Sequence, residues 1–385
     1  MATPRQLLWH DLWHDSMRFV LTPTVPRVIP RFSANTDVDC SPQTPVREDR
    51  SVNPADRVTA FSARLHSLDD LLNRFATEHR IRVALASGDV HRVARGWYVS
   101  GALWNASHIE DRLLLRVLAA ARTSRSPLVF SHASAAAIWG LPLFRRTLGP
   151  VQVTLPRTPH ASSTRTVRRH VADLSDSAVT VLADLRCTTL RRTAIDLART
   201  ERAEVSLPAA DAALRLEAPP PRVRAGSRAA SRSWRDERAR WLAELDTLPA
   251  ANGHATARRL LTHVDARAES PLESVSRLHL LRMGFRVRLQ VPVPAPDGRH
   301  YWVDLELCDH AVLAEVDGRS KYRDAGETRA TSAEAVVYAE KRRHDWISGT
   351  TGKRLVRWGA TDIRSTRALG ERLRAFGVEI PRAPW

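Results

Sequence analysis

The spacing of apolar residues changes along the chain and divides it into segments. Residues 67–79, SLDDLLNRFATEH, carry Leu and Phe at helical spacing behind Ser67, a residue type that caps helix N-termini. The following stretch, IRVALASGDVHRVARGWYVS, predicts a short helix from Ile81 to Ala86 that ends at Gly88. It then predicts two extended pieces, HRVAR and GWYVS, that meet in a turn at Gly96.

Helix, short helix and β-ribbon are the elements of a winged helix-turn-helix, which we place at residues 56–105. In such a domain these basic residues would contact DNA phosphates: Arg80, Arg82, His91, Arg92 and Arg95. A basic solvated surface is the alternative. Residues 1–55 are rich in Pro, Ser, Thr and Asp without sustained periodicity, which predicts a disordered N-terminal extension.

Residues 106–217 mix helical and extended patterns, among them IEDRLLLRVLAAAR, VQVTLPR and VSLPAADAALRLE, and predict an α/β middle domain. Within it, SHASAAAIWGLP predicts a helix with Ser131 as cap and Gly140 as stop. His132 lacks a Ser/Asp or Cys partner pattern, so we expect a helix-start or packing role. Residues 218–262 are Pro-rich and then Arg-rich, typical of a basic linker that runs into a helix.

Residues 263–385 show the sharpest pattern. RAESPLESVSRLHLLRMGF predicts a helix with Ser270 as N-cap, Pro271 at the first position and Gly284 past its end. RVRLQVPVP predicts an edge strand because of its prolines, and HYWVDLEL a strand by strict alternation. AVLAEVDG, SAEAVVYAEKRRHDWISG, KRLVRW and STRALGERLRAFG continue as strand, helix, strand and helix. The expected order is therefore αβββαβα, within a chain of α/β and α+β multidomain class.

Carboxylates occupy two of these strands. Glu315 and Asp317 are two residues apart in a strand and share a face, and Asp304 belongs to the preceding strand. Like charges so close are costly to bury unless something compensates them. Oxygen ligands on a rigid sheet suit Mg²⁺ or Mn²⁺, so Asp304, Glu315 and Asp317 are candidate metal ligands. Glu306 shares the face of Asp304, but we expect it to be a salt-bridged or solvated edge residue.

The net charge of the chain indicates what kind of partner it binds. The chain has 59 Lys and Arg against 42 Asp and Glu, a net charge of +17 that favours nucleic acid, with compositional habit as the alternative. Three unpaired cysteines argue for a reducing cytosol and against a disulfide framework or zinc site. No apolar run is long enough for a membrane helix and no signal peptide is recognisable, so we expect a cytoplasmic protein. A basic protein with a hard-cation site points to phosphodiester hydrolysis.

Four motifs of the C-terminal segment, AESPLES, VDLEL, AEVDG and EKRRHDW, carry a family resemblance. They resemble PD-(D/E)XK nucleases, in particular the domain of unknown function related to very-short-patch-repair endonucleases. The resemblance implies a restriction-endonuclease-like core in which Asp304 and Glu315 bind the metal and Glu269 or Glu273 is the helix-borne acid. Asp317 stands where the superfamily has its catalytic lysine, and Lys321 or Lys341 would supply the missing cation. Lys341, Arg342 and Arg343 would flank the DNA groove or form a solvated face.

Residues 60–215 resemble AbiEi-type antitoxins more loosely, through VHRVARGWYV, SHASAAAIWGLP and TTLRRTAIDLAR. This resemblance implies DNA binding and a toxin partner. The expected function is thus a DNA-binding protein with a Mg²⁺-dependent endonuclease-like domain. The alternative is a non-enzymatic, antitoxin-like transcriptional regulator with a degenerate nuclease fold.

Overall fold

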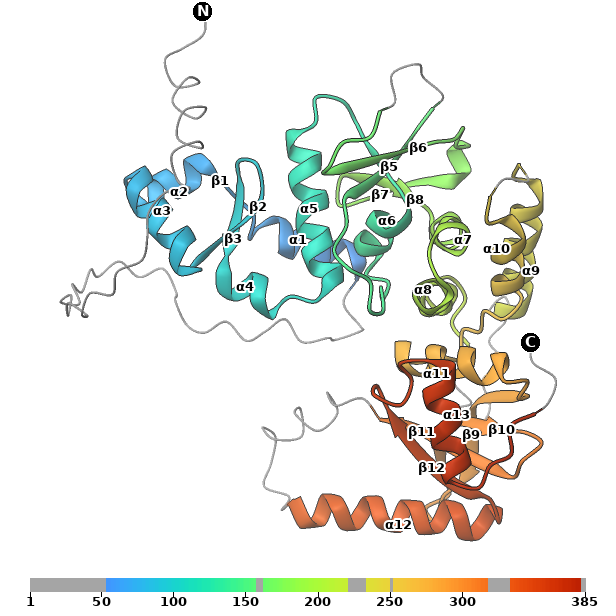
Figure 1. Cartoon of the computed structure of the whole chain (residues 1–385). Coiled ribbons are helices and arrows are strands. Elements are labelled where there is room, and N and C mark those ends of the chain that lie inside the picture. Colours follow the sequence, from blue (N-terminus) through green and yellow to red (C-terminus); the bar gives the residue numbers. More distant parts are fainter. Residues whose placement is uncertain (1–52, 157–161, 221–232, 250–251, 318–332, 382–385) are drawn as a thin grey trace, which may run out of the picture. The chain divides into compact units, whose positions relative to one another are not determined.

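The computed structural model describes residues 53–156, 162–220, 233–249, 252–317 and 333–381, with the backbone alone for 333–337. These residues form helices and three β-sheets, a mixed α/β architecture (Figure 1). Apart from Asn53 to Ala55, the predicted disordered extension lies outside the described residues.

The N-terminal elements are largely those that the sequence predicts. They are α1 (Pro54–Ser62), β1 (His66–Ser67), α2 (Leu68–Phe75), α3 (Glu78–Ser87), β2 (Val90–Ala94) and β3 (Trp97–Ser100). Ser67 caps α2 through a reciprocal bond with Asp70, and Gly88 ends α3 at a φ of 82°. The strands form an antiparallel sheet in the order β1-β3-β2. Helix α1 was not predicted, because ordered patterning was expected to begin only at Ser67.

The middle of the chain surrounds a five-stranded sheet of order β6-β5-β4-β8-β7. Its elements are α4 (Gly101–Ala106), α5 (Ile109–Thr123), β4 (Val129–Phe130), α6 (His132–Trp139), β5 (Val151–Leu155), β6 (Val167–Val171), the 3₁₀ turn η3 (Asp176–Ala178), β7 (Val179–Leu182), β8 (Leu185–Thr188), α7 (Leu190–Thr200) and α8 (Ala203–Glu217). Two further helices, α9 (Trp234–Thr247) and α10 (His254–Leu261), bury Trp241, Leu245 and Leu261 in the same core. The basic segment before the C-terminal domain therefore contributes core helices.

The C-terminal elements follow in the expected order of helix, three strands, helix, strand and helix. They are α11 (Pro271–Arg282), β9 (Val287–Pro294), β10 (His300–Leu307), β11 (Val312–Asp317), α12 (Ala333–Thr351), β12 (Arg354–Gly359) and α13 (Thr366–Ala375). The sheet has the order β12-β11-β10-β9, with β11 and β12 parallel and the other pairs antiparallel. Strand β9 is an edge strand, as its prolines predicted.

The strict alternation predicted for β10 is wrong at its centre. Leu305 packs in a cluster with α11 and α13, whereas Val303, two residues earlier, packs with Leu313 and with Ile347 of α12. The interruption coincides with Gln290 on the neighbouring strand, whose φ is 50°. A left-handed residue inside a strand redirects the side chains around it. Asp304, between Val303 and Leu305, therefore lies where the inward-facing side chains of β10 change from one face of the sheet to the other.

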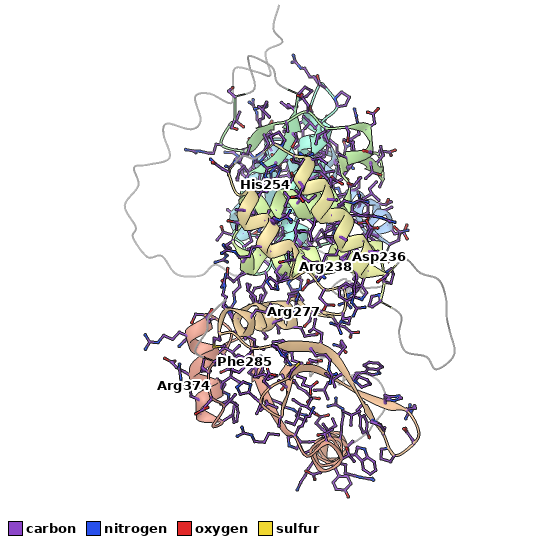
Figure 2. The ribbon with its side chains drawn as sticks, turned by 90° about the vertical axis from the view of Figure 1, so that its right-hand side faces the viewer. Asp236, Arg238, His254, Arg277, Phe285 and Arg374 are labelled. Carbon is purple, nitrogen blue, oxygen red and sulfur yellow. The ribbon has the colours of Figure 1, made fainter. Side chains whose placement is uncertain are left out.

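A buried ion pair fastens α11 to α8. Arg277 donates to both carboxylate oxygens of Asp211, at 2.9 and 2.7 Å (Figure 2 labels Arg277). The backbone N–H of Asp265 donates to Oδ1 of the same aspartate at 2.8 Å. Asp211 is 1% and Arg277 5% exposed. The helix that carries Glu273 is thereby anchored in the core of the preceding region.

Candidate metal and nucleic-acid site

Asp304 and Glu315 come from neighbouring antiparallel strands, as expected. Leu305 pairs with Ala314, and Asp304 and Glu315 are the next residues along their two strands. Oδ2 of Asp304 accepts a hydrogen bond of 2.8 Å from the backbone N–H of Val316. The Asp304 carboxylate is therefore held against β11.

Glu273 joins this pair from α11. It is 4% exposed, and its carboxylate accepts from Ser270 Oγ at 2.7 Å and from the backbone N–H of Glu269 at 2.8 Å. Gln290 Nε2 donates to it as well, at 3.1 Å. Burial, and then the charge of Asp304, raise the pKa of Glu273 to about 7. Glu273 thus closes the N-terminal cap of α11 and also lies close enough to Asp304 for the two charges to repel each other.

The other predicted acids occupy different positions. Glu269 is exposed at the start of α11, and its backbone rather than its carboxylate is tied to Glu273. Asp317 ends β11, is half-buried and pairs across the sheet with Gly359. Glu306 forms salt bridges with Arg288 and Lys353, as predicted, although its side chain is only 4% exposed.

Glu315 is neutralised by two guanidinium groups. Its Oε2 accepts from Arg357 of β12, with Nε at 2.8 Å and Nη2 at 2.6 Å, and its Oε1 pairs with Arg343 of α12. Arg357 also pairs with Glu340. The compensation for this buried carboxylate is therefore arginine in the structure, whereas the sequence suggested a metal ion.

The cations proposed to replace the missing lysine are differently placed. Lys321 lies outside the described residues, and Lys341 is exposed on α12, as is Arg342. Arg343, predicted to flank a DNA groove or to belong to a solvated face, is partly exposed and contacts Glu315. Sequence reasoning missed Gln290 and Arg357, because nothing in their local pattern reveals which carboxylate they reach.

The donor set suits a hard cation, because Asp304, Glu273, Glu315 and Asp317 offer only oxygen. Burial and, after it, repulsion from Asp304 raise the pKa of Glu273, and a cation between the two carboxylates would relieve the repulsion. Among the described residues, however, no group of three or more Asp, Glu, His or Cys side chains is arranged to hold a metal. In the described part of the chain, the predicted ligands Asp304, Glu315 and Asp317 therefore do not form a metal cage.

The N-terminal basic residues lie on two adjoining elements. Arg80 and Arg82 are exposed on α3, and Arg92 and Arg95 are exposed on the β2–β3 ribbon. His91 is half-buried, because its ring stacks on Trp104 with centroids 3.9 Å apart. Helix α3 also exposes Val83, at 54%. The four arginines are thus accessible to a polyanion, while His91 is used in packing.

A second polar cluster is buried in the middle region. His132, at the start of α6 with a φ of 52°, stacks on His170 with centroids 3.7 Å apart. Burial, and then the charge of Arg192, lower the pKa of His132 to about 3. Asp196 lies nearby and pairs with Arg192 at 2.9 Å. The expected helix-start and packing role of His132 agrees with this position.

No family model, curated protein or solved structure matches this chain. The two family resemblances therefore stay predictions from the motifs. In the described part of the chain, no helix has both the length and the apolar character needed to cross a bilayer.

Proposed function

We propose that this is a cytoplasmic DNA-binding protein whose C-terminal domain hydrolyses DNA phosphodiester bonds with Mg²⁺ or Mn²⁺. The observation that carries the proposal is the approach of buried Glu273 on α11 to Asp304 on β10, beside the strand β11 that carries Glu315 and Asp317. The order of helices and strands around them is the one implied by the PD-(D/E)XK resemblance, with a restriction-endonuclease-like core. The N-terminal elements would then be a winged helix-turn-helix.

In this proposal the cation would be bound by Asp304, Glu315 and Asp317, and Glu273 would be a further carboxylate next to it. A bound divalent cation would lower the pKa of an attacking water and neutralise charge on the phosphate. The exposed Lys341 and Arg342 of α12 would contact the DNA backbone near the site. Arg82 and Arg92, on α3 and the ribbon, would supply much of the salt-dependent affinity.

Incubation of the full-length protein with supercoiled plasmid and Mn²⁺, with and without EDTA, tests the activity. Asp304→Asn should abolish cleavage while DNA binding stays intact. Asp309→Asn is the matched control, because Asp309 is an exposed acid of the same domain paired with Arg286. Absence of cleavage on duplex, mismatched, branched and single-stranded DNA would refute the nuclease proposal.

The arginine pairs of Glu315 favour a second candidate, the non-enzymatic antitoxin-like regulator. A carboxylate with both oxygens ion-paired has no need of a metal, and a domain built this way would serve as a DNA clamp. This candidate requires salt-sensitive DNA binding that is indifferent to EDTA, and a toxin partner that co-purifies with the chain. Metal-dependent cleavage lost in Asp304→Asn would exclude it.

A further inference from the structure

The carboxylate of Glu315 is closed to a cation by its arginine partners. Arg357 donates to Oε2 through Nε at 2.8 Å and Nη2 at 2.6 Å, and Arg343 donates to Oε1. The Glu315 side chain is only 10% exposed, so few approaches to its oxygens exist. A divalent cation at this carboxylate would also meet two positive groups in direct contact with it. Cation binding at Glu315 therefore requires that one arginine leave.

The two arginines are anchored differently. Arg357 is the register partner of Glu315 on the parallel neighbouring strand, and it also pairs with Glu340. Strand pairing fixes its Cα beside the carboxylate. Arg343 reaches Glu315 from α12, where no strand pairing fixes it. It also pairs with Glu340 at 3.6 Å, lies over the Tyr301 ring and donates a 3.0 Å bond to the Trp302 carbonyl. Arg343 is thus the partner that can move away without breaking the sheet.

Arg343 is also close to surface that suits DNA. Its side chain is 23% exposed, and the preceding residues of α12, Lys341 and Arg342, are exposed cations. A guanidinium binds phosphate with the same two-pronged geometry that it uses for carboxylate. A DNA phosphate drawn to these cations, in the middle of α12, would offer Arg343 a partner equivalent to Glu315.

We propose that Arg343 couples nucleic-acid binding to divalent-cation binding by exchanging Glu315 for a DNA phosphate. Without DNA, Arg343 occupies Oε1 of Glu315 and keeps the affinity for cations low. With DNA, the guanidinium moves to a phosphate and Oε1 becomes a cation ligand. This inference rests on the proposed function. Because such coupling is reciprocal, DNA tightens cation binding by the same factor as the cation tightens DNA binding.

Titration of the full-length protein with Mn²⁺, followed through the electron paramagnetic resonance signal of free Mn²⁺, tests the exchange. In the absence of DNA, Arg343→Gln should bind Mn²⁺ about 5- to 100-fold more tightly than the wild type, the usual range of such coupling. Arg342→Gln is the matched control, since it removes the same charge from the same helix without touching Glu315. Its Mn²⁺ affinity should stay near that of the wild type.

A second measurement needs no variant. Addition of a short DNA duplex to the wild type should tighten Mn²⁺ binding within the same range, after subtraction of Mn²⁺ bound by the duplex alone. Equal affinities of Arg343→Gln and Arg342→Gln, together with no effect of the duplex on the wild type, would overturn the inference. If the wild type nevertheless cleaves DNA, the proposed function survives that result. If no protein binds Mn²⁺ in any condition and none cleaves, both are overturned.

Discussion

The buried pair between Arg277 and Asp211 makes a quantitative prediction about stability. Arg277→Met keeps an unbranched side chain but removes the guanidinium, leaving Asp211 with the 2.8 Å bond from the Asp265 N–H and a hydrogen bond from the Ser274 hydroxyl, both from neutral groups. Because Asp211 is 1% exposed, water cannot replace the lost partner. Breaking such a pair by removing one member costs about 3–5 kcal/mol of unfolding free energy.

Urea unfolding followed by circular dichroism and tryptophan fluorescence measures this loss. Burial already raises the pKa of Asp211, and removal of the guanidinium that opposes this should raise it further. The loss should therefore grow as pH rises above 3.8, the ordinary pKa of an aspartate, because the unfolded chain then releases a proton that Asp211 of the folded variant retains. Asp211→Asn should recover part of the stability in the Arg277→Met background, since no buried charge remains. Arg286→Met is the control, because Arg286 and Asp309 form an exposed pair worth about 0–1 kcal/mol. A loss for Arg277→Met no larger than for this control would refute the reasoning.

Three further outcomes are expected. Replacing Arg82 and Arg92 by Ala should reduce the slope of log affinity against log salt by about 0.9 for each lost phosphate contact, measured by fluorescence anisotropy on duplex DNA; an unchanged slope would exclude these contacts. Since the pKa of His132 is lowered from 6.5 to about 3, the unfolded chain binds a proton that the folded chain does not, and stability should fall by about 1.4 kcal/mol for each unit that the pH drops below 6.5 toward 3. His132→Asn should reduce this loss in a pH series of urea melts, and an unchanged pH dependence would exclude the contribution of His132. Gly253→Ala should cost roughly 2–4 kcal/mol, because a Cβ there would lie 2.1 Å from the Arg199 carbonyl at a φ of +85°. Gly298→Ala, with a φ of +77° and nothing within 4 Å of the added Cβ, should cost only about 1–2 kcal/mol in the same assay.

The elements that the sequence predicts well are those whose causes are local. Ser270 and Pro271 start α11 and Gly140 ends α6, since cap and turn chemistry involves residues within one helical turn. The edge position of β9 follows equally from its prolines. Such local signals predict the αβββαβα order of helices and strands without any knowledge of how they pack.

The site depended on contacts that no local pattern encodes. Arg343 and Arg357 reach Glu315 from 28 and 42 residues away, and either could have been a solvated cation by its own sequence context. The left-handed backbone of Gln290 and the resulting change of face at Asp304 arise from tertiary packing, which overrides the alternating pattern of β10. The sequence therefore identified the acids but could not identify what neutralises them.

The way in which each buried carboxylate is neutralised bears on the choice between the nuclease and the non-enzymatic regulator. Glu306 and Asp211 receive their counter-charge from arginine or lysine, which is how a structural carboxylate is made tolerable. Glu273 differs, because within the described chain its carboxylate is held by a hydroxyl, an amide and a backbone N–H, all of them neutral, while Asp304 repels it. A scaffold gains nothing from that repulsion, whereas acids with perturbed pKa values cluster where chemistry is done. Glu315 has the counter-charge of a structural carboxylate, from Arg357 on Oε2 and Arg343 on Oε1. In the proposed exchange, release of Arg343 would free Oε1 alone, and the Mn²⁺ titration of Arg343→Gln tests whether that is enough for a cation to bind.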